Sequence, residues 1–339
     1  MNKKEIFISL GALVFFFWMY YSPSFMFNDT GIRGFFAKGS LEREVKEGTL
    51  KVAEKSASFD FFSLFHKEAR VLFVGDSMFD RTIRSRASTH GENFIFSCVK
   101  DFLTSFDVVV ANLEGPVTSF DSKSVGTVPG QEGNTTFTFS PTIPKVLFDH
   151  NVRVVSLGNN HITDFGREGV EMTRLYLKKA SVDYFGDPFD SKKKSTVVSV
   201  PGATLGIVGY NQFLGVDTIA QTVEEIERLN DEVDHVIVFS HWGDEYVDAN
   251  QFQKSSARIF IDAGADVVFG AHPHVIQKRE EYKGKTIYYS LGNFVFDQYW
   301  DDSVRKGLGV EMVVRGDELS FVEHVFELGR DGRTCLVLE

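Results

Sequence analysis

The chain is poor in cysteine and has no excess of basic residues. Its two cysteines among 339 residues, Cys98 and Cys335, exclude a disulfide-rich scaffold and a zinc site built from four thiolates. They could pair or stay free, because their spacing decides nothing. Lysine and arginine total 36 against 47 aspartates and glutamates, a net charge of −11. That balance argues against a general nucleic-acid-binding protein, whose phosphate contacts need basic side chains.

The N-terminal region contains a long run without charge. Residues 6–27 carry no charged side chain, and about 20 apolar residues suffice to cross a bilayer as a helix. Lys3 and Lys4 precede the run, which favours a cytoplasmic N-terminus. Neither a small-residue cleavage site nor a cysteine follows it. We therefore expect an uncleaved signal-anchor in the cell membrane, with the C-terminal domain extracytoplasmic; a cleaved signal peptide is the alternative.

Charge divides the chain into regions. Residues 1–69 have a net charge of +1 and residues 70–339 a net charge of −12, so the acidic balance belongs to the C-terminal part. We predict a transmembrane helix within residues 1–27, a stalk with one helix in residues 28–69, a globular domain in residues 70–329 and a short tail in residues 330–339.

Short apolar runs alternate with helix-like stretches in the globular domain. Runs rich in β-branched residues predict buried strands, and amphipathic stretches between them predict helices, so the fold class is α/β. The runs are residues 71–74, 107–111, 153–156, 236–239 and 266–269, and the helix-like stretches are residues 168–180, 222–230 and 251–263. Residues 309–314 and 319–326 predict a hairpin, and residues 119–137 an insertion or lid-like loop.

Polar side chains follow each of the five buried strands. In open α/β sheets, ligands bind outside the carboxyl ends of the strands, so these segments can converge on one site, with their glycines allowing sharp turns. The segments are residues 75–76, 112–114, 158–161, 241–245 and 270–274. Carboxylate, carboxamide and imidazole ligands together suit Mn²⁺, Fe or Zn²⁺ better than Ca²⁺ or Mg²⁺. We expect one or two divalent metal ions.

Each of these residues also has an ordinary structural explanation. Asp76 could cap a helix, Glu114 could lie on a surface loop, and His241 could be a hydrogen-bonded histidine at a strand end. The pair His272 and His274 is harder to explain by packing, because two imidazoles flank a proline. The agreement of all five segments in their position after a strand favours a functional site.

The order of these motifs resembles the CapA family of bacterial capsule (poly-γ-glutamate) synthesis proteins. The resemblance implies a calcineurin-like metallophosphatase fold, a four-layer α/β/β/α sandwich with metals at the strand ends. It also implies an anionic polymer such as poly-γ-glutamate, or a phosphoester, as a binding partner, and a membrane-bound capsule synthase nearby. The matching segments are residues 74–81, 111–115, 156–161, 164–169, 239–246, 270–274 and 289–296.

Roles for single residues follow from the resemblance. Asp76 and His274 would hold a first metal, Glu114 would bridge, and a second metal would take the remaining ligands, which are Asn160, His241 and His272. His161 would protonate a leaving group or stabilise charge. Further candidates for substrate contact are Arg81, Asn112, Glu245 and Asn293. One departure stands out, because Met78 occupies a position where the wider phosphoesterase pattern has a histidine, and a thioether is a poor ligand for a hard metal site.

Two functions fit these observations. One is a membrane-anchored, metal-dependent hydrolase or transferase that acts on a phosphoester or a γ-glutamyl amide. The other is a non-catalytic assembly or export factor, or a polymer-binding module, of a membrane synthase. The acidic domain repels a polyanion at long range, so an anionic substrate would have to be held by a metal or a local basic patch.

Overall fold

The structure is a computed structural model that describes residues 68–215 and 218–337. The anchor expected at residues 6–27, and nearly all of the stalk with its expected helix, lie outside the described residues. Within the part of the chain that is described, no helix is both long and apolar enough to cross a membrane.

The strands of the described residues form two sheets. The first has the order β14-β13-β12-β1-β2-β3-β4, with β11 paired to β1, and the second has the order β5-β6-β7-β8-β10-β9. The first sheet comprises β1 (Ala69–Ser77), β2 (Val108–Leu113), β3 (Val152–Ser156), β4 (Asp183–Phe185), β11 (Asn293–Val295), β12 (Lys306–Arg315), β13 (Glu318–Leu328) and β14 (Thr334–Leu336). The second comprises β5 (Ser195–Val200), β6 (Ala203–Asn211), β7 (His235–His241), β8 (Val267–Ala271), β9 (Glu280–Tyr282) and β10 (Lys285–Tyr288).

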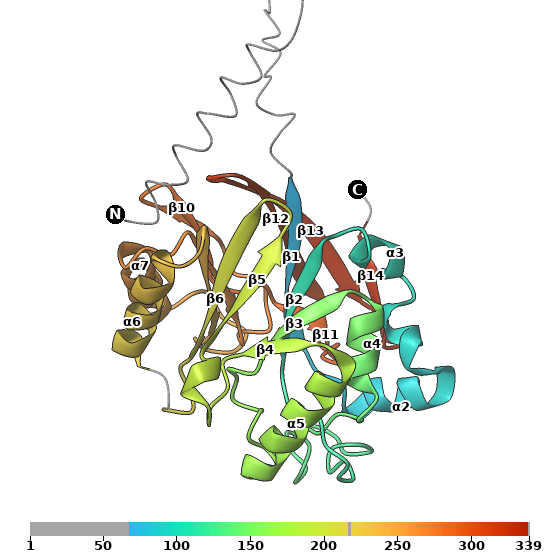
Figure 1. Ribbon diagram of the computed structural model, residues 1–339. Helices are drawn as coiled ribbons and strands as arrows, with labels where there is room; N and C mark the ends of the chain where they lie inside the picture. Colours follow the sequence, from blue (N-terminus) through green and yellow to red (C-terminus); the bar gives the residue numbers. More distant parts are fainter. Residues whose placement is uncertain (1–67, 216–217, 338–339) are drawn as a thin grey trace, which may run out of the picture. The chain divides into compact units, whose positions relative to one another are not determined.

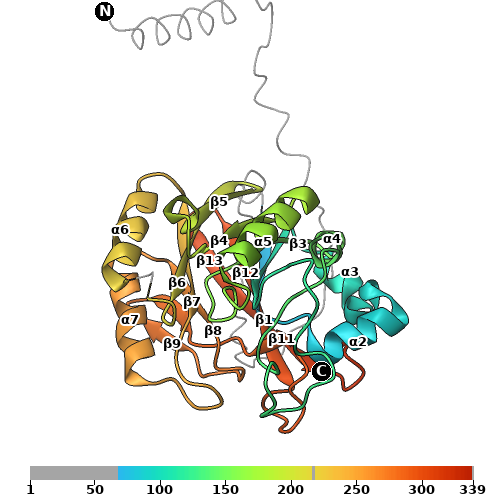
Figure 2. The same ribbon diagram turned by 90° about the horizontal axis from the view of Figure 1, so that it is seen from below.

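Helices cover the outer face of each sheet (Figures 1 and 2). The first sheet is covered by α2 (Arg81–His90), α3 (Lys100–Leu103), α4 (Ile143–Asp149) and α5 (Gly166–Ala180), and the second by α6 (Ile219–Asn230) and α7 (Gln251–Asp262). Short 3-10 helices, η2 (Glu92–Phe96) and η3 (Ser191–Lys193), complete the connections. The layers therefore follow the order helix, sheet, sheet, helix.

Alternation along the strands explains the layering. In β1, Val71 and Phe73 face the core between the sheets, whereas Leu72 and Val74 pack under the helices. Successive side chains of a strand point to opposite faces, so a strand covered on both sides needs an unbroken apolar run. Phe73 contacts Phe269 of the second sheet, with ring centroids 4.3 Å apart.

The predicted α/β organisation is confirmed. The five apolar runs form β1, β2, β3, β7 and β8, the helix-like stretches form α5, α6 and α7, and the predicted hairpin forms β12 and β13. Strands β4, β9, β11 and β14 were not predicted, since three residues are too few to show a period. Residues 334–336, predicted to be part of a short tail, form β14 and pair with β13.

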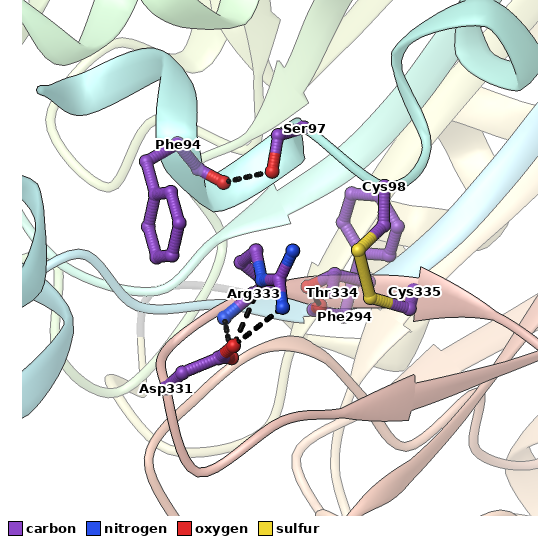
Figure 3. The surroundings of a disulfide bond; sticks show 8 residues. All are labelled: Phe94, Ser97, Cys98, Phe294, Asp331, Arg333, Thr334 and Cys335. Carbon is purple, nitrogen blue, oxygen red and sulfur yellow. Dashed lines mark hydrogen bonds and ion pairs between the residues drawn. A yellow bond between two sulfur atoms is a disulfide. The ribbon is translucent and has the colours of Figure 1, made fainter. Parts of the chain in front are cut away.

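Cys98 and Cys335 form a disulfide (Figure 3). The bond joins the segment after η2 to β14, and it links positions 237 residues apart in sequence. Beside it, the Thr334 hydroxyl donates a hydrogen bond to the carbonyl oxygen of Phe294. The bond resolves the question that the sequence left open, and together with β14 it fixes the C-terminal segment to the domain.

Candidate metal centre

The strand ends bring the predicted site residues together. Strands β1, β2 and β3 are parallel neighbours in the first sheet, and β7 and β8 are parallel neighbours in the second. Their carboxyl ends therefore meet at one side of the sandwich. The side chains that gather there are those of Asp76, Asn112, Glu114, Asn160, His241, His272 and His274.

Two glycines allow the backbone to pack closely around this site. A Cβ atom on Gly75 would lie 1.9 Å from the carbonyl oxygen of Gly292, and one on Gly270 would lie 1.9 Å from that of Tyr289. Both glycines lie inside strands, β1 and β8. These glycines were predicted to allow sharp turns, but what the structure requires of them is the close approach of another backbone segment.

Asp76 is completely buried and accepts hydrogen bonds on both oxygens. Its Oδ1 accepts from the Asn112 amide at 2.8 Å, and its Oδ2 accepts from the backbone N–H of His272 at 3.0 Å. The His274 Nδ1 atom lies 3.3 Å from Oδ2. Burial raises the pKa of Asp76, but His274, His241 and Asn112 outweigh burial and leave that pKa at about 2. Asp76 is therefore a carboxylate at neutral pH.

Asparagine side chains orient His241. The Asn112 amide nitrogen lies 3.2 Å from Nδ1 of His241, on one side of the ring. The Nε2 atom of His241 lies 2.8 Å from the Asn160 side-chain oxygen. Asn159 holds Asn112 in turn, because its amide donates to the Asn112 oxygen at 3.2 Å. Burial, followed by the charge of His272, lowers the pKa of His241 well below its usual value, so the imidazole is neutral.

Glu114 is the least compensated group of the site. Its side chain is completely buried, and neither carboxylate oxygen has a hydrogen-bond partner among the described residues. The Nε2 atoms of His241 and His274 each lie 3.8 Å from its Oε1. Burial, together with the charges of Asp76 and Glu245, raises the pKa of Glu114 well above the usual value. A buried carboxylate without partners is costly unless a positive charge accompanies it.

These residues fit a divalent metal. Three sets of potential ligand atoms lie within 4.8 Å of one another: Glu114 with His241 and His272, Asp76 with Glu114 and His274, and Glu245 with His272 and His274. Ligands bound to one metal at ~2.0–2.2 Å lie roughly 3–3.5 Å apart. The distance of 3.3 Å between Asp76 and His274, and those of 3.8 Å from Glu114 to His241 and to His274, are close to that range. Glu114 belongs to two of the three sets.

His272 supplies a second unsatisfied group. Its Nδ1 atom is buried and has no hydrogen-bond partner in the described part of the chain. Burial, with the charge of His274, lowers the pKa of His272 to about 4. Both histidines adopt positive φ angles, 96° for His272 and 58° for His274. Non-glycine residues in this region cost energy and cluster at functional sites.

His161 lies at the edge of the cluster beside the long loop. Its Nδ1 atom lies 3.0 Å from Oδ2 of Asp164, and the same oxygen accepts the backbone N–H of Phe137 at 2.7 Å. The ring of Phe137 lies 4.4 Å from the His161 ring. The loop predicted at residues 119–137 thus ends against His161, and Asp164 fixes the orientation of the imidazole.

The four residues expected to contact substrate lie in different environments. Glu245 is exposed. Arg81 is partly buried, pairs with Asp297, and has its guanidinium carbon 5.1 Å from the centroid of the Phe137 ring. Asn112 is completely buried within the network described above. Asn293 is also completely buried, and its oxygen lies 2.9 Å from His274 Nδ1, so it is placed to orient His274.

The Met78 side chain does not face the cluster of potential metal ligands. Its side chain is completely buried in the apolar core between the first sheet and its helices. The backbone N–H of Asp80 points to its sulfur, at 2.9 Å. Position 78, where the resemblance implied a departure from the usual ligand pattern, therefore belongs to the hydrophobic core.

Several neighbours of the site were not among the predicted site residues. Asp164 was predictable, because it follows His161 by three residues within a matching motif, whereas Asn159 was named only as part of its segment. Tyr246 was also named only as part of its segment, and its ring lies 5.9 Å from that of His274. Phe213 gave no signal in the sequence, yet its ring lies 4.3 Å from that of His272. Such contacts depend on loop geometry, which apolar periodicity does not report.

Comparison with solved structures supports the fold class. A crystal structure described as a novel phosphatase from Mycoplasma pneumoniae matches 78% of this chain and 96% of its own, with a TM-score of 0.50 and 13% identity. At that identity the likeness concerns the fold alone. The chain therefore has a phosphatase-like, two-sheet α/β fold.

Sequence comparison gives the family. The pattern described as "Bacterial capsule synthesis protein PGA_cap" matches residues 70–298, and this chain belongs to that family. It is 34% identical over 250 residues to the "PGA biosynthesis protein CapA" of Bacillus subtilis, covering 67% of this chain. It is 31% identical over 258 residues to the "Capsule biosynthesis protein CapA" of Bacillus anthracis, covering 69% of this chain. The matches span 63% and 62% of those two relatives.

Proposed function

We propose that this chain is a membrane-anchored protein of capsule or poly-γ-glutamate synthesis or export, with a metal-dependent hydrolase-type site at the strand ends. The family membership supports the first part, because the two relatives are named for capsule or PGA biosynthesis. The observation that carries the second part is Glu114, a buried carboxylate without a hydrogen-bond partner among the described residues. A divalent cation would compensate that charge.

The ligands divide into two groups around Glu114. Asp76 and His274 would hold one ion, and His241, His272 and the Asn160 oxygen would hold another. The donor set favours Mn²⁺, Fe or Zn²⁺. A metal bound here would polarise an ester or amide oxygen and lower the pKa of a bound water.

His161 is the proposed proton donor of the reaction. Its Nδ1 faces Asp164 at 3.0 Å, so its Nε2 is the ring atom left for substrate. An imidazole held this way can give a proton to a leaving oxygen or nitrogen, or stabilise charge on the transferred group. Arg81 would face an anionic group of the substrate, and Glu245 would act at the exposed rim.

An extracytoplasmic position fits the disulfide. Disulfides form and persist in oxidising compartments and are rare in the cytosol, and Cys98 is bonded to Cys335. Protease treatment of spheroplasts tests this part of the proposal. We expect digestion of the domain without lysis, whereas a domain protected until lysis would contradict it.

The hydrolase proposal is tested with the purified full chain and defined substrates. The protein is loaded with Mn²⁺ or Zn²⁺ and assayed on phosphoesters and on γ-glutamyl peptides. We expect His161→Ala to lower turnover about 10²-fold or more, whereas the control His90→Ala, at an exposed position, leaves it unchanged. Equal turnover in both variants would contradict the role of His161.

A non-catalytic assembly or export role is the second candidate. The observation that favours it is Met78, which is buried in the core at a position where the wider phosphoesterase pattern has a ligand. Complementation of a deletion strain separates the two roles. Polymer restored in full by His272→Ala favours assembly, and polymer lost with folded His272→Ala protein favours catalysis.

A further inference from the structure

An open groove of about 660 Å³ lies beside β4 and the C-terminal half of α5. Figures 1 and 2 both show α5 next to β4 at the edge of the first sheet. Three basic side chains line the groove, Arg174, Lys178 and Lys193, against one acidic side chain, Asp183. The described groove shares no lining residue with the strand-end cluster.

The segment that builds this groove differs in charge from the rest of the domain. Residues 167–194 contain seven basic and five acidic side chains, a net charge of +2, although residues 70–339 together have a net charge of −12. The remaining residues of the domain therefore have a net charge of −14. A local basic surface on a strongly acidic domain marks where an anionic partner can approach.

Two of the three cations are fixed in position. Arg174 makes a two-pronged ion pair with Asp187, with Nε 2.6 Å from Oδ2, and keeps 25% of its side chain exposed. Lys193 Nζ lies 2.9 Å from Asp183 and 4.9 Å from the centroid of the Tyr184 ring. Side chains that are already ordered lose little further freedom when a ligand binds.

Among the described residues that line the groove, Lys178 is the cation for which no ion pair is seen. It is exposed on the last turn of α5, and no ion pair joins it to another of the described residues. Its charge is therefore available to a ligand, whereas those of Arg174 and Lys193 are partly neutralised.

We propose that this groove binds a stretch of a polycarboxylate chain, and this inference rests on the proposed role in poly-γ-glutamate synthesis or export. Carboxylates repeated along one polymer can contact Lys178, Lys193 and Arg174 together. Repulsion from the acidic remainder of the domain is screened over about 8 Å at physiological salt, so contacts inside the groove outweigh it. Such binding weakens as salt rises.

Fluorescence anisotropy with labelled poly-γ-glutamate tests the groove. The full chain in detergent micelles is treated with a chelator, so that no metal can bridge protein and polymer, and is titrated at 50 and 150 mM salt. We expect binding that weakens at the higher salt, a loss of about ten-fold in affinity for Lys178→Glu, and a smaller loss for Lys178→Gln. The control Lys100→Glu makes the same change in net charge at an exposed position of α3 and should stay within about two-fold.

The outcomes separate the groove from the metal site. No binding, equal losses in Lys178→Glu and Lys100→Glu, or tighter binding of a phosphodiester polymer would overturn the groove proposal. Metal uptake without polymer binding would refute the groove alone. Polymer binding to a chain that takes up no metal would leave the groove intact and refute the proposed metal site.

Discussion

Replacing Glu114 by glutamine should stabilise the metal-free protein at neutral pH. The side chain is completely buried without a hydrogen-bond partner among the described residues, and burial with the charges of Asp76 and Glu245 raises its pKa well above the usual value. Glutamine has nearly the same shape and cannot ionise. The change therefore removes a buried charge without opening a cavity.

The sign of the pH dependence follows from the raised pKa. The folded state binds the Glu114 proton more tightly than the unfolded state, so the free energy of unfolding falls as pH rises from about 4.5 towards the folded-state pKa. Each pH unit between the two values costs about 1.4 kcal/mol. An uncompensated buried charge typically costs about 3–5 kcal/mol, so we expect Glu114→Gln to exceed wild type by about 3 kcal/mol at pH 8.

Asp76 and His272 are present in both proteins, so their own pH dependence enters both unfolding curves and largely cancels in the difference. The pKa of Asp76 is about 2, below its usual 3.8, so its contribution is present above pH 3.8 and is lost only as pH falls through 2. The pKa of His272 is lowered to about 4 from 6.5, so its contribution is complete above pH 6.5 and is lost as pH falls to 4.

Denaturant unfolding of both proteins in chelator, at pH 4 and pH 8, measures this difference. We expect the gap to be near zero at pH 4 and about 3 kcal/mol at pH 8. Saturating Mn²⁺ or Zn²⁺ should then stabilise wild type by about 2.7 kcal/mol at 100 times its Kd and the variant far less. A variant less stable than wild type at pH 8 in chelator would refute the reasoning.

Further predictions concern the disulfide, the proton donor and the close backbone approach. The bond between Cys98 and Cys335, which are 237 residues apart, restricts the unfolded chain, and the chain-entropy model gives this restriction a stabilising effect of about 5.5 kcal/mol. We expect the free energy of unfolding of the double serine variant to fall by about 3–5 kcal/mol. A decrease below 1 kcal/mol in urea unfolding would contradict this. Asp164→Asn should lower turnover about 10-fold or more and shift the pH–rate profile, with metal content unchanged; an unshifted profile would argue against its positioning of His161. Gly75→Ala puts a Cβ atom 1.9 Å from a carbonyl oxygen and should yield little folded protein, measured by circular dichroism. The control Gly158→Ala, whose added Cβ atom would lie 3.5 Å from its nearest neighbour, should fold.

The layered α/β organisation could be predicted because buried strands need unbroken apolar runs. Residues 71–74 and 236–239 belong to strands covered on both faces, so no exposed polar side chains interrupt their apolar runs. Short elements escaped prediction for the opposite reason. β11 spans only Asn293–Val295 and takes its place from pairing with β1, which is a tertiary contact without a local signature.

The site could be predicted in outline and not in detail. Side chains after successive parallel strands must lie near one another, and the structure brings Asp76, Glu114, His241, His272 and His274 together. The sequence could not distinguish a ligand from a residue that holds one, because both are polar and both follow a strand. Asn293 is the example, since its burial and its contact with His274 depend on how β11 packs against β1.

Metal content per chain is the most direct test of the strand-end site. The full chain is purified, equilibrated with Mn²⁺, Fe²⁺ or Zn²⁺, dialysed and analysed for bound metal, with Glu114→Gln and His272→Ala beside wild type and His90→Ala as control. We predict one or two ions per chain for wild type and the control, and a loss of at least one ion in each site variant. No retained metal in wild type, or equal retention in all four proteins, would contradict the account.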